Sequence, residues 1–252
     1  MKKSILTLSA ALLLLVASCS KNNEIPKEET KTCRQTEAKF NDGTVFQYTY
    51  DDKGRVSTWK QLWEGGEIET VTYQYSASEI IETVKGEKTN VTKHTLNASG
   101  NITKSSTADG YDGQTYITDY TYDANGYLTQ IKESNSTAVT LGYTNGNLTS
   151  ISNQQVTYTI TYGNETYNGG FFRYNTNDTF PEELETPLFS YFGKRSKALP
   201  IKSVVNWGGM ENTESYTYEK DANGNIVKFV NSVKASTNTS YSNTIQYTYN
   251  CN

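Results

Sequence analysis

Aromatic and polar residues alternate with a period of two in many short stretches of the chain. The clearest stretch is Tyr48-Thr49-Tyr50, which is followed by Asp51 and Gly54. A period of two places both tyrosines on one face of a β-strand and the threonine on the other. Asp starts a turn by accepting hydrogen bonds from nearby backbone amides, and Gly supplies the positive φ that tight turns require. Each copy of this pattern therefore predicts one β-hairpin.

Further copies of the pattern fill most of the sequence. Fuller copies begin at Tyr120 and Tyr216, weaker copies cover residues 96–102 and 143–148, and Tyr247-Thr-Tyr249 lies near the last residue. One hairpin cannot bury a face alone, so the copies should lie side by side as a meander of about 14 to 16 strands. Such a sheet exposes two edges unless it curls shut. The predicted fold is all-β, a multi-stranded antiparallel meander rolled or closed into a barrel.

The pattern breaks between about residues 166 and 199, which we interpret as an insert. Pro187 would break a continuous helix, so the expected element is a short helix after it. The insert is either a mobile lid over a binding site or a plug inside the β wall. The plug is favoured because a large barrel is not filled by its own wall residues. Four apolar side chains of the insert follow helical spacing, namely Leu184, Leu188, Tyr191 and Phe192.

The first residues are typical of an export signal. Lys2 and Lys3 precede an apolar stretch, residues 5–16, that is too short for a normal spanning helix. The small residues before Cys19 resemble a bacterial lipobox, which implies cleavage before Cys19 and lipidation of that residue. Several acyl chains would then hold the protein on a membrane. The alternative is an ordinary secretory signal cleaved near Ala17.

The chain is therefore expected to have three parts. Residues 1–18 would be a lipoprotein signal peptide, residues 19–32 a lipid-anchored flexible tether, and residues 33–252 a single β domain. The expected location is the cell envelope, as an outer-membrane lipoprotein that faces either the periplasm or the cell surface. Because exported compartments are oxidising, Cys33 and Cys251 could form a disulfide that staples the first strand to the last. The alternative is two unpaired thiols.

Composition excludes several classes of partner. The 252 residues include 36 Thr, 24 Asn and 20 Tyr, which suits strands joined by many turns. A net charge of −4, without any block of Lys or Arg, argues against nucleic-acid binding. The Gly-Gly pairs at 169–170 and 208–209 lack the helix and the Lys of a phosphate cradle, so no nucleotide and no cofactor is expected.

Candidate catalytic and metal-binding residues are few. His94 is the only histidine, it lies in a strand-like stretch, and the sequence has no Gly-x-Ser-x-Gly motif. We therefore expect no catalytic residue of the Ser-His type and no metal site. Most carboxylates lie in turns or on a solvated face, where their role is structural. Two of them brought together could instead serve glycoside hydrolysis.

The three tryptophans, Trp59, Trp63 and Trp207, are the candidate ligand platform. Flat aromatic faces suit sugar rings, and Asn, Asp and Gln side chains supply partners for sugar hydroxyls. The alternative is that the tryptophans and the repeat tyrosines pack across neighbouring strands.

Two resemblances rest on the same motifs. The residues Tyr50-Asp51-x-x-Gly54-Arg55 resemble the Tyr-Asp repeats of the Rhs and teneurin shells. Over roughly residues 32–252, the sequence is more similar to a Bacteroidetes lipoprotein family of unknown function with a porin-like fold. This second resemblance rests on Cys19, the Tyr-Thr-Tyr-Asp-x-x-Gly hairpins and residues 187–193. It implies a fold and no activity. A porin-like fold need not span a membrane here, because the Thr, Ser, Asn and charged residues on the strand face opposite the tyrosines would make a poor lipid-facing band.

The sequence thus favours a non-enzymatic, lipid-anchored envelope protein with a binding or scaffolding role, whose ligand is a glycan or another envelope protein. Two alternatives stay open. One is a glycan-degrading hydrolase that uses paired carboxylates about 5 to 9 Å apart. The other is a purely structural shell whose interior is filled by the insert.

Overall fold

Sixteen β-strands make up most of the computed structural model, which describes residues 33–109, 112–167, 181–237 and 239–251. These residues belong to one compact unit, residues 31–252. The only helical elements among them are two 3-10 turns, η1 (Glu182–Leu184) and η2 (Phe189–Tyr191). No helix in the described ranges is long and apolar enough to cross a membrane. The strands are β1 (Cys33–Phe40), β2 (Val45–Tyr50), β3 (Val56–Trp63), β4 (Gly66–Tyr75), β5 (Glu79–Lys85), β6 (Thr89–Leu96), β7 (Ile102–Ala108), β8 (Thr115–Tyr122), β9 (Leu128–Glu133), β10 (Val139–Thr144), β11 (Asn147–Ser152), β12 (Val156–Thr166), β13 (Ala198–Trp207), β14 (Met210–Lys220), β15 (Ile226–Lys234) and β16 (Ser240–Cys251).

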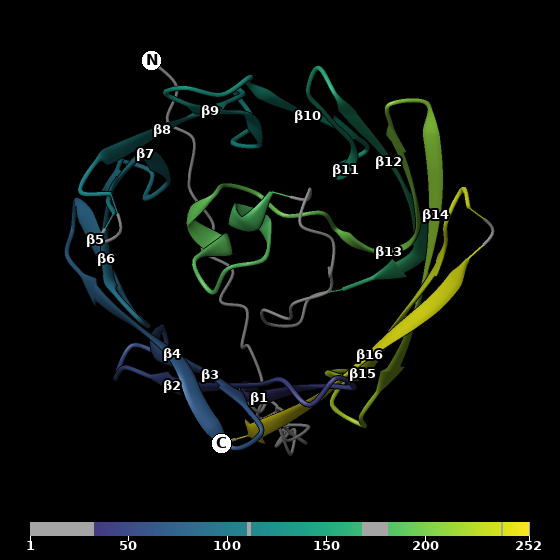
Figure 1. The fold of residues 1–252 in the computed structure, drawn as a ribbon, viewed down its shortest axis with the longest axis horizontal. Helices are drawn as coiled ribbons and strands as arrows, with labels where there is room; N and C mark the ends of the chain where they lie inside the picture. The colour runs from purple at the N-terminus through teal and green to yellow at the C-terminus, as the bar shows by residue number, and fades with distance from the viewer. Residues whose placement is uncertain (1–32, 110–111, 168–180, 238, 252) are drawn as a thin grey trace, which may run out of the picture. The chain divides into compact units, whose positions relative to one another are not determined.

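The strands pair in chain order, each antiparallel to the next, and β1 pairs with β16 to close a barrel. Figure 1 shows them as a ring in which the first and last strands meet. The predicted antiparallel meander closed into a barrel is confirmed. Closure pairs both edge strands, which an open sheet would leave exposed. A disulfide joins Cys33 to Cys251, which lie opposite each other in the closing pair.

Several hairpin turns share one set of hydrogen bonds. In turn 51–55, Oδ1 of Asp51 accepts hydrogen bonds from the backbone amides of Lys53 and Arg55, at 3.0 and 2.9 Å. Gly54 adopts a φ of 78°, which residues with a Cβ rarely do. Each turn therefore depends on one Asx oxygen and one glycine. Turns 97–101, 123–127 and 221–225 repeat this arrangement around Asn97, Asp123 and Asp221.

The second tyrosine of a hairpin copy ties two strands together. The Tyr122 hydroxyl donates a hydrogen bond to the Ile102 carbonyl on the preceding strand, at 2.5 Å. These partly buried hydroxyls are thereby satisfied within the wall. The same bond to the preceding strand joins Tyr50 to Gln35, Tyr75 to Val56, Tyr218 to Pro200 and Tyr249 to Ile226.

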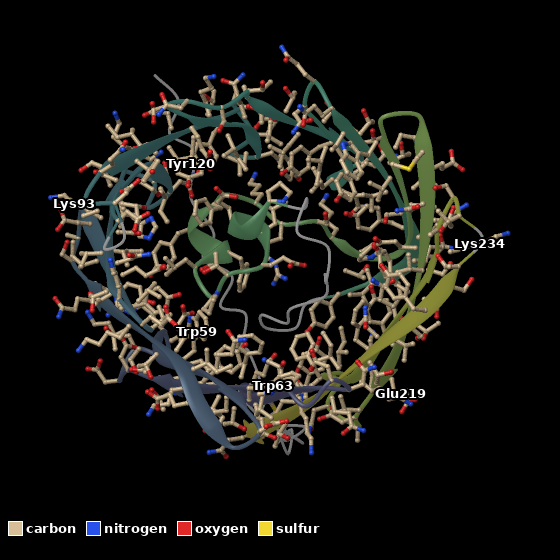
Figure 2. All side chains as sticks on the ribbon, in the orientation of Figure 1. Trp59, Trp63, Lys93, Tyr120, Glu219 and Lys234 are labelled. Carbon is tan, nitrogen blue, oxygen red and sulfur yellow. A yellow bond between two sulfur atoms is a disulfide. The ribbon has the colours of Figure 1, made fainter. Side chains whose placement is uncertain are left out.

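The inner face of the wall is mainly aromatic and aliphatic, with a few buried polar side chains such as His94 and Glu214, whereas the outer face is mainly polar. Tyr120 is buried, as are Tyr48, Tyr216 and Tyr247 at the same place in their copies. Figure 2 shows Lys93 and Lys234 on the outside of the ring, with Trp59 and Tyr120 on the inside. The outer face carries cross-strand ion pairs such as Lys60–Glu67 (2.6 Å) and Lys228–Glu219 (2.7 Å). Such a face differs from the apolar band of a membrane-spanning barrel.

The described part of the insert, residues 181–197, lies inside the ring of strands (Figure 1). Leu188 and Phe192 are 1% and 4% exposed and belong to the core. The Phe192 ring lies 5.0 Å from the Tyr120 ring, so this part of the insert is a plug. The short helix expected after Pro187 is only the 3-10 turn η2. Pro187 and Gly193, whose φ is 87°, leave too few residues between them to nucleate an α-helix.

The meander gives the barrel two distinct ends. The insert end carries the four Asx turns, the insert and the disulfide. The tryptophan end carries the hairpin turns that follow Trp63 and Trp207. Both of these turns have positive φ at two successive residues, 49° and 79° at Glu64 and Gly65, and 56° and 84° at Gly208 and Gly209. Two positive φ angles are typical of type I′ hairpins, which place each tryptophan at the rim.

Candidate functional site

A cavity of about 400 Å³ lies between the wall formed by β2–β5 and the insert. We term it the Trp59 cavity. Its size, and its combination of aromatic walls with a few polar groups, are typical of sites for small ligands. Its aromatic lining is Phe46, Tyr48, Trp59 and Tyr73, and its polar lining includes Gln61, Glu69, Glu82 and Glu185.

Neighbouring strands hold the aromatic side chains of this cavity in place. Tyr48 lies opposite Trp59 in the β2–β3 register. The Trp59 indole donates a hydrogen bond from Nε1 to the Tyr73 hydroxyl at 3.1 Å, and its ring lies 5.4 Å from that of Phe46. Burial, and then the nearby Glu82 carboxylate, raise the pKa of Tyr73 well above its usual value. The Tyr73 hydroxyl therefore stays protonated, and the platform is organised before any ligand arrives.

The three carboxylates of the cavity come from three elements. Glu69 lies on β4, Glu82 on β5 and Glu185 in the insert. Glu82 pairs with Tyr73, which is four residues from Glu69, a distance of about 13 Å at roughly 3.3 Å per residue. The carboxyl groups of a glycosidase pair lie about 5 to 9.5 Å apart. The register of β4 and β5 thus gives no direct support for Glu69 and Glu82 as such a pair.

His94 takes part in a buried polar network. Its Nδ1 lies 2.8 Å from Oγ of Ser105, and its Nε2 lies 3.6 Å from Oε2 of Glu82. Ser105 also donates to the Tyr120 hydroxyl at 3.2 Å, which donates to Oε1 of Glu183 at 3.2 Å. These residue types match a Ser-His-acid triad. However, His94 and Ser105 are 6% and 5% exposed and neither lines the Trp59 cavity, so Ser105 is not placed to attack a ligand bound there.

The three tryptophans do not form one surface. Trp59 and Trp63 lie four residues apart on β3, and alternation directs both to the inner face. Trp59 lines the cavity, whereas Trp63 is 42% exposed at the rim. Trp207 is 56% exposed on β13, which is six strand positions from β3 around the ring. The structure therefore brings Trp59 and Trp63 to one strand and leaves Trp207 apart from them.

The other candidate residues lie away from this cavity. Cys33 and Cys251 form the disulfide, with sulfur atoms 2.02 Å apart. Cys19, the expected lipidation site, lies outside the described residues. Within the described ranges, no group of three or more His, Cys, Asp or Glu side chains is placed to hold a metal ion.

Sequence reasoning missed most of the cavity lining. The inward position of Gln61 could have been inferred from the sequence, because Gln61 lies two residues after Trp59 on the same strand and so faces the same side. Glu69 and Glu82 carry no comparable local signal. They become neighbours of Trp59 only through the pairing of β3 with β4 and of β4 with β5.

Comparisons with known proteins agree with this architecture. A porin-like protein from Bacteroides uniformis is 23% identical in sequence, with a TM-score of 0.68 over 88% of this chain and 96% of that one. A porin-like protein from Bacteroides vulgatus is 14% identical, with a TM-score of 0.57 over 86% of this chain and 98% of that one. Identities this low establish the fold alone. No curated protein matches the sequence. Residues 41–228 match one family, and the chain therefore belongs to the domains of unknown function (DUF4595) with porin-like fold.

Proposed function

We propose that this protein is a non-enzymatic, lipid-anchored envelope protein that binds a glycan in the Trp59 cavity. The observation that carries the proposal is the cavity of about 400 Å³, whose aromatic wall is fixed by the Trp59–Tyr73 hydrogen bond. A pre-formed aromatic cavity lowers the entropic cost of binding, because few side chains need to become ordered.

The chemistry of the lining suits a carbohydrate. A sugar ring presents C–H groups on its faces, which pack on the flat rings of Trp59 and Tyr48. Its hydroxyl groups need acceptors and donors around the ring edge. The Gln61 amide offers both, and the carboxylates Glu69 and Glu82 offer acceptors.

A panel of host and dietary oligosaccharides tests this proposal on the full chain in mild detergent. A ligand at 100 times its dissociation constant adds about 2.7 kcal/mol to the free energy of unfolding. For a chain of this size that is a rise of roughly 5 to 10 °C in the thermal midpoint. One glycan class should produce this rise, Trp59→Ala should abolish it, and Gln61→Ala should weaken it.

Trp207→Ala is the matched control, because it removes the same side chain far from the cavity. It should leave the rise in midpoint unchanged. No rise for any glycan, or a rise that survives Trp59→Ala, would exclude glycan binding in this cavity.

The lipid anchor is a separate part of the proposal. It rests on Cys19 and the apolar stretch before it, and on the polar residues between Cys19 and β1. Cells fed a labelled fatty acid should incorporate the label into this protein, and Cys19→Ala should prevent incorporation. A labelled Cys19→Ala protein would contradict anchoring at that residue.

A glycan hydrolase is the second candidate, favoured by the three carboxylates in the cavity. Product analysis on any glycan that binds separates the two functions. A hydrolase should release shorter products and lose this activity in Glu82→Gln, whereas a binding protein should return the glycan intact. A purely structural shell, in turn, predicts that no glycan binds at all.

A further inference from the structure

A second cavity, of about 360 Å³, lies at the insert end of the same wall. It is bounded by the first residues of β1, the turn at residues 51–55 and the insert, and it shares Pro187 with the Trp59 cavity. We term it the Arg34 cavity. Its charged lining is Arg34, Lys53 and Arg55, and no carboxylate is among its described lining residues. The Trp59 cavity has the opposite character, with three glutamates and no Lys or Arg in its described lining.

Arg55 is a fixed and compensated charge in this cavity. Its Nη2 lies 2.6 Å from Oδ2 of Asp51, and its guanidinium lies 4.1 Å from the ring centroid of Tyr75. Burial opposes ionisation of Asp51, but hydrogen bonds from the Arg55 side chain and backbone outweigh it and lower the pKa of that carboxyl. The Arg55 charge is therefore compensated by Asp51. Arg34 and Lys53 are the two cations of this cavity that are left to bind a ligand.

Arg34 and Lys53 lack such compensation. Across the described part of the chain, neither has a carboxylate within ion-pair distance. Arg34 instead lies over the Tyr50 ring, 5.6 Å from its centroid. Its Nη2 lies only 2.7 Å from the point that a Cβ on residue 54 would occupy. Gly54 thus leaves room for the guanidinium at this wall of the cavity.

Gln35 supplies an independent observation. It lines the Arg34 cavity, it is 3% exposed, and neither its Nε2 nor its Oε1 has a hydrogen-bond partner among the described residues. A buried amide without a partner is unfavourable, because it has lost its hydrogen bonds to water. A polar group bound in this cavity would restore such a partner.

We propose that the Arg34 cavity binds a small organic oxyanion, a ligand that bears a carboxylate or a phosphate group. The guanidinium of Arg34 offers two parallel N–H donors to such a group, and Lys53 adds a second positive charge. The rings of Tyr75 and Tyr191, stacked at 5.9 Å, give the carbon part of the ligand an aromatic surface. The glutamates of the Trp59 cavity repel the same anion, so the two cavities select different ligands.

Titration of the full chain in mild detergent with three probes tests this proposal. The probes are glucuronate, its neutral amide glucuronamide, and inorganic phosphate, measured by calorimetry at low ionic strength because salt screens exposed charges. At least one oxyanion should bind about tenfold more tightly than glucuronamide, which corresponds to about 1.4 kcal/mol. Binding of glucuronate alone identifies a carboxylate site, and binding of phosphate alone identifies a phosphate site.

Variants locate the bound anion. Arg34→Gln combined with Lys53→Gln should remove the preference for the oxyanion, and Arg34→Lys should retain part of it. Lys93→Gln combined with Lys228→Gln, which removes two positive charges from the outer wall, should leave it unchanged. Trp59→Ala should also leave it unchanged, so failure of the glycan proposal would not affect this one. The proposal is overturned if neither oxyanion is preferred to glucuronamide, or if the preference survives in the Arg34/Lys53 double variant.

Discussion

The two ends of the barrel are built differently. At the insert end, tyrosine hydroxyls bind carbonyl groups of the preceding strand, and Leu188 and Phe192 fill the interior. At the tryptophan end, large side chains near the hairpin turns are exposed, including Trp207 at 56% and Tyr241 at 57%. Buried contacts stabilise a fold more than exposed ones do. The stability of this domain is therefore expected to depend mainly on contacts at the insert end. Substitutions at the tryptophan end should change the free energy of unfolding much less.

Removing the disulfide should have the largest effect. Cys33 and Cys251 are 218 positions apart in sequence, so their bond restricts almost the whole unfolded chain. If the disulfide acts by lowering the entropy of the unfolded chain, closing a loop of this length raises the free energy of unfolding by about 5 kcal/mol. Replacing both cysteines by serine should lower the free energy of unfolding by about that amount in urea denaturation. Adding reductant to the unaltered protein should give the same loss. A loss below about 1 kcal/mol would mean that β1–β16 hydrogen bonds alone hold the closing pair.

Matched substitutions at the two ends give the next largest difference. Phe192→Ala removes a ring that is 4% exposed and should cost about 3 to 5 kcal/mol of unfolding free energy. Trp207→Ala removes a larger side chain that is 56% exposed and should change the same quantity by about 0.5 kcal/mol or less. Urea denaturation of both variants measures the two values. Equal losses would refute the unequal division of stability between the ends.

The barrel could be predicted because its signals are local. A Tyr-Thr-Tyr strand and an Asx-x-x-Gly turn are read from seven consecutive residues, and repetition of the unit orders the strands. Closure is not local, because it requires Cys33 and Cys251 to meet across the whole chain. The position of the insert also depended on distant contacts. Pro187 and Gly193 leave room only for a 3-10 turn where helical spacing predicted a helix, and burial of Leu188 and Phe192 places this segment against the wall.

The candidate site was harder to predict than the fold. Trp59 was identifiable because it is one of only three tryptophans in the sequence. The His94–Ser105–Glu82 cluster was not, because it forms across β5, β6 and β7. Strand register determines which inward residues meet, and no local motif in the sequence shows which residues of β5, β6 and β7 will be opposite one another. The two cavities likewise depend on where the insert lies within the wall.

Alkaline pH should weaken the insert end through its tyrosines. Burial raises the pKa of Tyr50, Tyr162 and Tyr167 to about 12, from about 10 in an unfolded chain. A raised pKa favours the protonated folded state, so this stabilisation is complete below about pH 10 and is lost as the pH rises to about 12. Each tyrosine then reduces the free energy of unfolding by at most about 1.4 kcal/mol per pH unit. Tyrosinate absorbance and circular dichroism should therefore change together in that range. Ionisation of these tyrosines below pH 10, without loss of structure, would contradict their burial.

The smallest predicted effect concerns a single turn. Oδ1 of Asp123 accepts hydrogen bonds from the amides of Asn125 and Tyr127, both at 2.9 Å. Asn97 makes the same two bonds in its own turn, which shows that the oxygen matters and the charge does not. Asp123→Ala should therefore cost about 1 kcal/mol of unfolding free energy, whereas Asp123→Asn should be nearly neutral. Urea denaturation of the two variants measures this difference. If Asp123→Asn cost as much as Asp123→Ala, the carboxylate charge would be required, and the repeated turns at the insert end would not be equivalent.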